Sequence, residues 1–228
     1  MQLIYLAVLL TLCRVSCNVV KDDEPSHSVG MNDVLDDLLG KKCKKAGVKD
    51  AYKEFYKTYM TTMECMEKQY KPENNSDSSE ELCAYVNTNV RECFKIVVEN
   101  LQHCLEPEEK YLPKFIYDAF DKFLDLVCGD NFIELLASTS SAKCFEELSK
   151  HNFFEACANS PLWKSLTDNE HVIFKKEKLC ADMNELYDCR ENVIKKTCTE
   201  DVIVRNLFNK LHKAISFSCD KEDEDKTT

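Results

Sequence analysis

The sequence predicts an all-α fold, a bundle of about six to eight helices stapled together by disulfides. Three observations lead to this prediction. The 228 residues include only four glycines and five prolines, too few turn formers for an all-β sandwich. Apolar residues recur every three or four positions along most of the chain, which is the period of an amphipathic helix. Fourteen cysteines are spread through the chain, and an even set of cysteines in a secreted protein indicates disulfides.

Residues 1–17 are predicted to be a signal peptide. The apolar run from Leu3 to Leu12 is followed by Val15-Ser16-Cys17, small residues of the kind that precede a cleavage site. The run is about ten residues long, whereas a membrane span needs roughly 20. We therefore expect a secreted mature chain from Asn18, without a membrane span. A lipoprotein acylated at one of the two cysteines within residues 1–17 is the alternative, and the flanking residues do not favour it.

Twelve cysteines remain after the signal peptide, and no two are closer than nine residues apart. This spacing lacks the C-x-x-C pairs that announce most zinc and redox sites, and the five histidines are scattered. We expect up to six disulfides between helices, no metal site and no cofactor, while the pairing stays open. The twelve are Cys43, Cys65, Cys83, Cys93, Cys104, Cys128, Cys144, Cys157, Cys180, Cys189, Cys198 and Cys219.

The first half of the chain is predicted to form two long helices. The first covers residues 52–70, with a face of tyrosines and methionines at steps of three and four. The second covers residues 82–104 and is preceded by a capping box at residues 78–81. Cys93 and Cys104 lie on nearly the same face of this second helix, so each should bridge to another helix and not to the other.

The middle of the chain is predicted to contain three further helices. One begins near Pro113, a residue tolerated in the first turn, and ends at Cys128 with Gly129 as its C-terminal cap. A short apolar helix over residues 132–137 leads into a Ser/Thr run, and another helix covers residues 142–157. Residues 159–168 are expected to form the main internal loop.

The last part of the chain is predicted to form two helices. The first covers residues 170–198, and its cysteines Cys180, Cys189 and Cys198 are nine residues apart. Nine residues turn a helix by about half a circle, so this helix should be bridged on both sides, as a central element would be. The final helix follows Thr199 and has acidic residues at its positively polarised start.

These elements define four regions. Residues 1–17 form the signal peptide, residues 18–42 a partly disordered N-terminal segment, residues 43–219 the cysteine-rich helical domain, and residues 220–228 an acidic disordered tail. The whole chain carries a formal charge of −11, which disfavours nucleic acid and anionic lipid surfaces as partners.

Aromatic and methionine side chains provide the main candidate binding site. Such side chains suit adaptable apolar pockets, although an ordinary core needs the same residues at the same spacing. The candidate lining residues are Tyr52, Tyr56, Tyr59, Met63, Phe120 and Phe123. The chain has no H-E-x-x-H, G-x-S-x-G or Walker motif, so no catalytic residue is assigned and a non-enzymatic role is expected. A sequon at Asn74-Asn75-Ser76 lies in a polar stretch between predicted helices and predicts glycosylation of Asn74.

Four cysteine-containing segments resemble the insect 27 kDa haemolymph glycoprotein family. They are Cys104-Leu105-Glu106-Pro107-Glu108-Glu109-Lys110, Leu124-Asp125-Leu126-Val127-Cys128-Gly129-Asp130, Lys143-Cys144-Phe145-Glu146 and the stretch from Leu179 to Cys189. The resemblance covers about residues 43–219 and includes all twelve cysteines. It implies a secreted, disulfide-bonded helical protein of haemolymph, and it brings no catalytic residues with it.

Three functions follow as hypotheses. The leading one is a non-enzymatic secreted haemolymph glycoprotein that carries a lipid or hormone-like hydrophobic ligand. The second is an effector secreted in saliva or venom that binds a host protein. The third is a hydrolase of an unrecognised kind.

Overall fold

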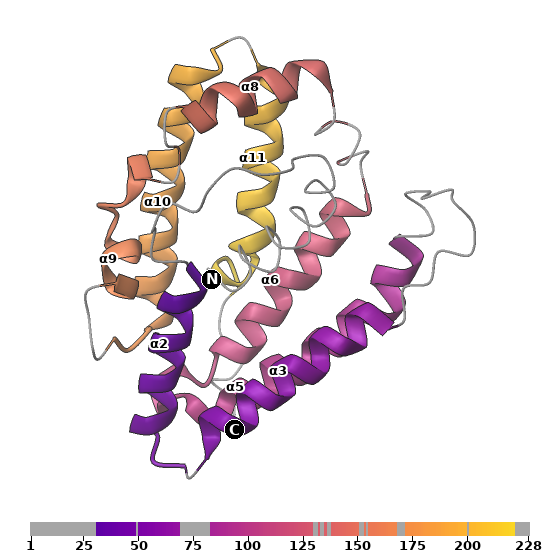
Figure 1. Ribbon diagram of the computed structural model, residues 1–228. Coiled ribbons are helices and arrows are strands. Elements are labelled where there is room, and N and C mark those ends of the chain that lie inside the picture. Colours follow the sequence, from indigo (N-terminus) through magenta and orange to yellow (C-terminus); the bar gives the residue numbers. More distant parts are fainter. Residues whose placement is uncertain are drawn as a thin grey trace.

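The structure is a computed structural model of the chain. It describes residues 31–48, 50–68, 83–129, 132, 135, 138–150, 153, 155–167, 172–199 and 201–221. Within these residues there are eight α-helices and no strand, which confirms the all-α prediction (Figure 1). The predicted signal peptide, the sequon at Asn74, the capping box at residues 78–81 and the end of the acidic tail lie outside the described residues.

Helices and short helical turns make up most of the described residues. In chain order they are α2 (Met31–Lys45), α3 (Ala51–Lys68), α5 (Arg91–Leu101), α6 (Leu112–Val127), α8 (Thr139–Lys150), α9 (Pro161–Thr167), α10 (Lys176–Thr197) and α11 (Val202–Ile215). A π-helical turn, η1 (Val86–Val90), leads into α5. Short 3-10 turns are η2 (Gln102–Cys104), η3 (Pro107–Glu109), η4 (Glu155–Cys157) and η5 (Phe217–Cys219).

The helices pack as a chain of neighbours. Helix α5 lies between α3 and α6, α6 packs on α11, and α11 packs on α10 (Figure 1). Helix α8 packs on both α10 and α11. The main core extends from α2 to α11, and it includes the rings of Phe94 and Phe120, whose centroids are 3.9 Å apart. A second, smaller core joins α8, α10 and α11 around Cys144, Leu148, Ile194, Cys198 and Val204.

All twelve cysteines from Cys43 to Cys219 are paired. The bridges are Cys43–Cys104, Cys65–Cys93, Cys83–Cys128, Cys144–Cys198, Cys157–Cys189 and Cys180–Cys219. As predicted, Cys93 and Cys104 bridge to other helices. Helix α10 is bridged to η5 through Cys180 and to η4 through Cys189. Cys198, directly after its last residue, bridges to α8, in agreement with the predicted central place of this helix.

Two segments differ from their predicted structure because serine side chains act as helix caps. The Ser/Thr run starts α8 at Thr139, since the Ser138 hydroxyl accepts a hydrogen bond from the backbone N–H of Ser141 at 3.3 Å. Helix α8 then ends at Lys150, and Cys157 lies in the separate turn η4. The predicted loop over residues 159–168 contains α9, where the Ser160 hydroxyl accepts from the N–H of Trp163 at 3.4 Å.

Gly129 ends α6 for a different reason from the predicted one. Its φ is not in the left-handed region, and the C-cap residue is Cys128 in a right-handed conformation. A side chain at position 129 would place its Cβ 2.9 Å from the backbone oxygen of Asp125, so the requirement is space. Among the described glycines, Gly47 is the one in the left-handed region, with φ of 70°, and it follows α2 as a C-terminal cap.

The packed domain begins before Cys43. Helix α2 starts at Met31, and both Leu38 and Leu39 are buried. The helix predicted over residues 170–198 begins later than expected. Helix α10 starts at Lys176, and residues 172–175 precede it without helical structure.

Candidate functional site

The most completely buried carboxylate of the described residues belongs to Glu109, which is 0 % exposed. The sequence Glu106-Pro107-Glu108-Glu109 forms the turn η3 because Pro107 suits the first position and Glu109 completes a capping box. The backbone N–H of Glu106 donates to Glu109 Oε2 at 3.2 Å. This local bond orients the carboxylate and leaves its other oxygen facing the neighbouring elements.

Lys42 of α2 supplies the positive charge for this carboxylate. Its Nζ lies 2.5 Å from Glu109 Oε1 and also donates to the backbone oxygen of Val172 at 2.6 Å. The same ammonium lies 5.0 Å from the centre of the Phe174 ring. The neighbouring bridge Cys43–Cys104 ties α2 to η2 and thereby holds Lys42 close to η3.

Side chains from α2 and from the region of η3 form hydrogen bonds with the backbone of residues 172–174. The N–H of Phe174 donates to Glu109 Oε1 at 2.8 Å, and the Tyr111 hydroxyl donates to the Phe174 oxygen at 2.9 Å. Together with the bond from Lys42 to Val172, three side chains engage three backbone groups of a non-helical segment. A backbone outside helices and sheets needs such partners when it is buried. We call Lys42, Glu109 and Tyr111 the backbone clamp.

The electrostatics of the clamp suit a structural role. Burial, and then the charges of Glu109 and Glu177, raise the pKa of Tyr111 above its usual value, so its hydroxyl stays a donor. The Glu109 oxygens already accept from Lys42, Phe174 and Glu106. Both charged groups are committed to the protein itself, and we assign no proton transfer to them.

Sequence reasoning missed the clamp. The capping pattern around Pro107 indicates a turn, and this pattern was the signal in the sequence that could have identified Glu109 as a structurally important residue. The partners lie 65 and 67 residues away in the chain, at distances that no local pattern encodes.

The predicted lining residues lie in two places. Tyr52, Tyr56 and Tyr59 form a row along α3, with ring centroids 6.4 and 6.5 Å apart. Tyr52 and Tyr59 are half-buried against the main core, whereas Tyr56 is 46 % and the adjacent Met60 45 % exposed. We call Tyr52, Tyr56, Tyr59 and Met60 the aromatic ridge. The side chain of Met63 lies outside what the structure describes.

Phe120 and Phe123 belong to the packed core and not to this ridge. Each is 3 % exposed on α6, and Phe120 contacts Phe94 of α5. Because α5 lies between α3 and α6, the two phenylalanines are separated from the ridge by a helix. For Phe120 and Phe123 the structure therefore shows the ordinary core role that their spacing also allows.

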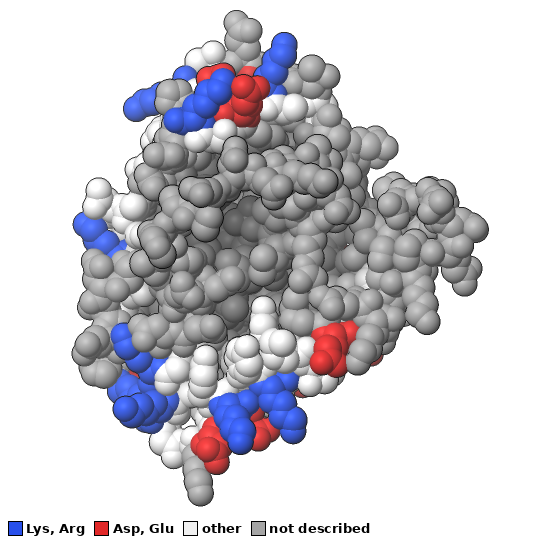
Figure 2. Space-filling view, viewed as in Figure 1, with Lys and Arg blue, Asp and Glu red and all other residues white. Residues whose placement is uncertain are grey.

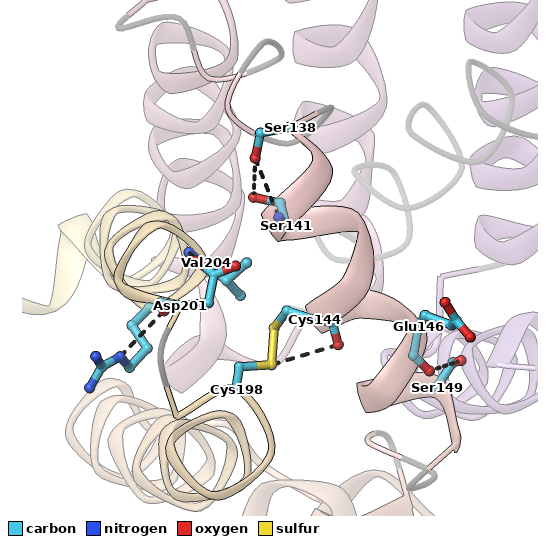
Figure 3. Close-up of a disulfide and its surroundings, with 9 residues drawn as sticks. Ser138, Ser141, Cys144, Glu146, Ser149, Cys198, Asp201 and Val204 are labelled. Carbon is cyan, nitrogen blue, oxygen red and sulfur yellow. Dashed lines mark hydrogen bonds between the residues drawn. A yellow bond between two sulfur atoms is a disulfide. The ribbon is translucent and has the colours of Figure 1, made fainter.

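The second core shows how the far end of the bundle is held (Figure 3). Cys144 of α8 and Cys198 after α10 are bridged beside the start of α11. The Asp201 side chain caps α11 by accepting from the N–H of Val204 at 3.0 Å, as the acidic residues before this helix predicted. In the same region the Ser138 hydroxyl caps α8 by accepting from the backbone N–H of Ser141.

Charged side chains of both signs are interspersed on the face shown in Figure 2. Lys and Arg lie beside Asp and Glu near α8 and near the ends of α2 and α3. On α8, Lys150 pairs with both Glu146 and Glu147, at 2.9 and 2.8 Å.

The described residues contain no group of three His, Cys, Asp or Glu side chains arranged to hold a metal ion. Within the same residues, no helix combines the length and apolar character that a bilayer crossing requires. Six disulfides are typical of proteins that mature in an oxidising, extracellular environment.

Comparison with known proteins adds a family. Residues 29–220 match the model of DUF1397, which is described as a protein family of unknown function. The chain belongs to the DUF1397 family. The match begins close to the start of α2 and ends just beyond η5, so it covers the whole described bundle. No curated protein and no solved structure matches the chain.

Proposed function

We propose that this DUF1397 protein is a secreted glycoprotein of haemolymph that acts by binding and not by catalysis. Its ligand is a hydrophobic small molecule, such as a lipid or a hormone-like compound, and the aromatic ridge of α3 is the binding surface. The resemblance to haemolymph glycoproteins supports the assignment to haemolymph, and the signal-like residues 1–17 support secretion. The six disulfides support a durable extracellular protein.

The exposure of the aromatic ridge is the observation that carries the proposal. Tyr56 and Met60 occupy neighbouring positions on one side of α3, and almost half of each side chain is exposed to solvent. Tyrosine offers a flat apolar ring with a polar end, and methionine adapts its shape to different apolar surfaces. Tyr52 and Tyr59 contact Tyr56 and are anchored against the core, which makes this surface pre-ordered.

Native mass spectrometry and probe binding test the proposal. The full chain, secreted from insect cells and purified without detergent, should carry a small molecule that dissociates on denaturation. The stripped protein should bind a fluorescent fatty-acid analogue. The double variant Tyr56→Ser, Met60→Ser should weaken that binding at least tenfold, because it removes the two most exposed apolar contacts of the ridge.

A matched variant separates the ridge from general surface hydrophobicity. Phe145 on α8 is 42 % exposed, and Phe145→Ser should leave probe binding unchanged. Equal binding by wild type and the ridge variant, with both folded by circular dichroism, would contradict the ridge as the ligand site. Absence of any bound or bindable hydrophobic compound would contradict the carrier function itself.

A further inference from the structure

The six disulfides fall into two closed sets. The bridges Cys43–Cys104, Cys65–Cys93 and Cys83–Cys128 lie within residues 43–128. The bridges Cys144–Cys198, Cys157–Cys189 and Cys180–Cys219 lie within residues 144–219. Among the cysteines that the structure describes, none of the first set is bridged to any of the second. We call residues 43–128 the first unit and residues 144–219 the second unit.

Both units have the same disulfide connectivity. When the six cysteines of each unit are taken in chain order, the first pairs with the fifth, the second with the fourth and the third with the sixth. Six cysteines allow roughly 15 pairings, so chance agreement between two units is about one in 15. The division into closed sets makes coincidence rarer still. The pattern therefore indicates a repeated structural unit.

The cysteines also occupy matching places on the helices. In both units the first cysteine lies on the opening helix, α2 or α8. The fifth cysteine follows the helix that carries the fourth, as Cys104 follows α5 and Cys198 follows α10. The sixth follows the next helix, as Cys128 follows α6 and Cys219 follows α11. The third cysteine stands in the same tripeptide, Leu-Cys-Ala, in both units, at residues 82–84 and 179–181.

The two units meet through equivalent elements. Helix α6 of the first unit packs on α11 of the second, and Phe115 and Phe123 share one core with Leu211 and Ile215. Contact of the same element in two copies is the arrangement found in a two-fold symmetric dimer. Polar bonds border this contact: the Ser218 hydroxyl donates to Asp118 at 3.2 Å, and Lys221 pairs with Asp118 at 3.6 Å.

The backbone clamp lies on the same boundary. Its side chains, from Lys42 just before Cys43 and from Glu109 and Tyr111 in the first unit, hold backbone groups of Val172 and Phe174 in the second unit. Three hydrogen bonds thus cross the boundary in addition to the apolar contact between α6 and α11, and the buried ion pair of Lys42 and Glu109 holds two of the side chains that make them. Such a combination of apolar centre and polar border is typical of a protein–protein interface.

We propose that the chain is a fused pair of six-cysteine units that bind each other as the subunits of a dimer do. The partner of the α6 face is the α11 face of the second unit, and the clamp adds contacts specific to this pairing. The covalent link between residues 128 and 144 is dispensable for their association once the disulfides have formed. A protease cut in this link leaves a two-chain protein that stays assembled.

The units differ in the element that carries the second cysteine. Cys65 lies on α3, a helix of 18 residues, whereas Cys157 lies in the short turn η4. The aromatic ridge is on α3, so it belongs to the part of the first unit that has no counterpart in the second. Repetition of one unit accounts for the shared disulfide connectivity, and the long helix α3 accounts for the difference between the two units.

Site-specific cleavage of the full chain tests the proposal. A protease recognition sequence is inserted between Asp130 and Asn131, and the folded, oxidised protein is cut. A denaturing gel without reductant should show two separate fragments. Native size-exclusion chromatography should show one peak with the mass of the uncut protein. In the cut protein, Tyr111→Phe should weaken association of the halves about tenfold, whereas Tyr56→Phe on the exposed ridge should not weaken it.

Two results would overturn the proposal. Fragments that stay linked on the non-reducing denaturing gel would show a bridge between units, and fragments that separate on the native column would show that the interface does not hold them. If the insertion prevents folding, mapping of disulfide-linked peptides in the unaltered protein decides the connectivity. A peptide that links a cysteine of residues 43–128 to one of residues 144–219 would contradict the two-unit architecture.

Discussion

The carboxylate of Glu109 accepts a hydrogen bond from the backbone N–H of Phe174, 65 residues further along the chain, at 2.8 Å. The same oxygen pairs with the ammonium of Lys42, so a fully buried charge is neutralised at the point where α2, η3 and the start of α10 meet. A buried ion pair contributes little net stability compared with apolar packing, but it is costly to break. Its value here is that it specifies which backbone segment docks at this place.

Glu109→Gln should therefore destabilise the protein strongly. Glutamine keeps the size of the side chain, but it leaves the buried ammonium of Lys42 without its counter-charge. Loss of one partner of a buried pair costs about 3–5 kcal/mol. Guanidinium unfolding followed by circular dichroism measures this change. The control Glu99→Gln, in an exposed pair with Lys95, should leave the midpoint almost unchanged. A midpoint for Glu109→Gln equal to that of wild type would show that the clamp is not structural.

Replacing Cys144 and Cys198 together by alanine should lower the free energy of unfolding by about 4 kcal/mol. The bridge closes a loop with a sequence separation of 54, and a loop of that length in the unfolded chain gains a corresponding entropy when it opens. The effect should appear first in the second core, because that core is small and is centred on this bridge. Hydrogen exchange of α8 and the start of α11 measures local opening, while exchange in α5 should be unaffected. Uniformly faster exchange across both units would contradict this localisation.

Asp118 should make the protein sensitive to acid. Burial would raise its pKa, but hydrogen bonds from Lys114 and Ser218 and the charges of Lys114 and Lys221 outweigh burial and lower the pKa. A lowered folded-state pKa contributes stability that is complete above the unfolded value of about 3.9 and is lost as the pH falls through the folded value. Urea unfolding between pH 6 and pH 2.5 should show this loss, and Asp118→Asn should flatten the curve below about pH 4. Glu185→Gln, on the exposed side of α10, serves as the control for removal of one surface carboxylate.

Protonation of His212 should lower the stability of the protein in a higher pH range than protonation of Asp118 does. Its ring stacks on Tyr187 with centroids 4.0 Å apart, and burial lowers its pKa although the charges of Asp188 and Asp220 oppose the change. The folded state then favours the neutral ring, so the contribution is complete above the unfolded pKa of about 6.5 and declines as the pH falls through the folded pKa. A titration of the His212 ring protons by NMR should have its midpoint below 6.5. Asp188→Asn should move that midpoint further down, and a move upward would contradict the assigned balance of charges.

Much of the local structure was predictable because its causes lie within a few residues. The period of apolar residues identified α3, α6 and α11, Pro113 marked the first turn of α6, and the acidic residues before Val202 indicated the cap that Asp201 makes. Local hydrogen bonding also explains two of the differences between predicted and observed boundaries. Ser138 and Ser160 begin helices in segments that were predicted as loop, since a serine favours both a turn and an N-cap.

The sequence by itself determined an all-α chain with an even, widely spaced set of cysteines from Cys43 to Cys219. It could not determine which cysteines pair, which apolar faces are covered, or that Lys42, Glu109 and Phe174 meet. Tyr56 and Phe120 belong to equally periodic stripes, yet one is half exposed and the other is in the core. Helical period and capping depend on contacts within about four residues, whereas coverage and pairing depend on how distant helices pack. Only the tertiary structure decided those contacts, and with them the repeated pattern of bridges.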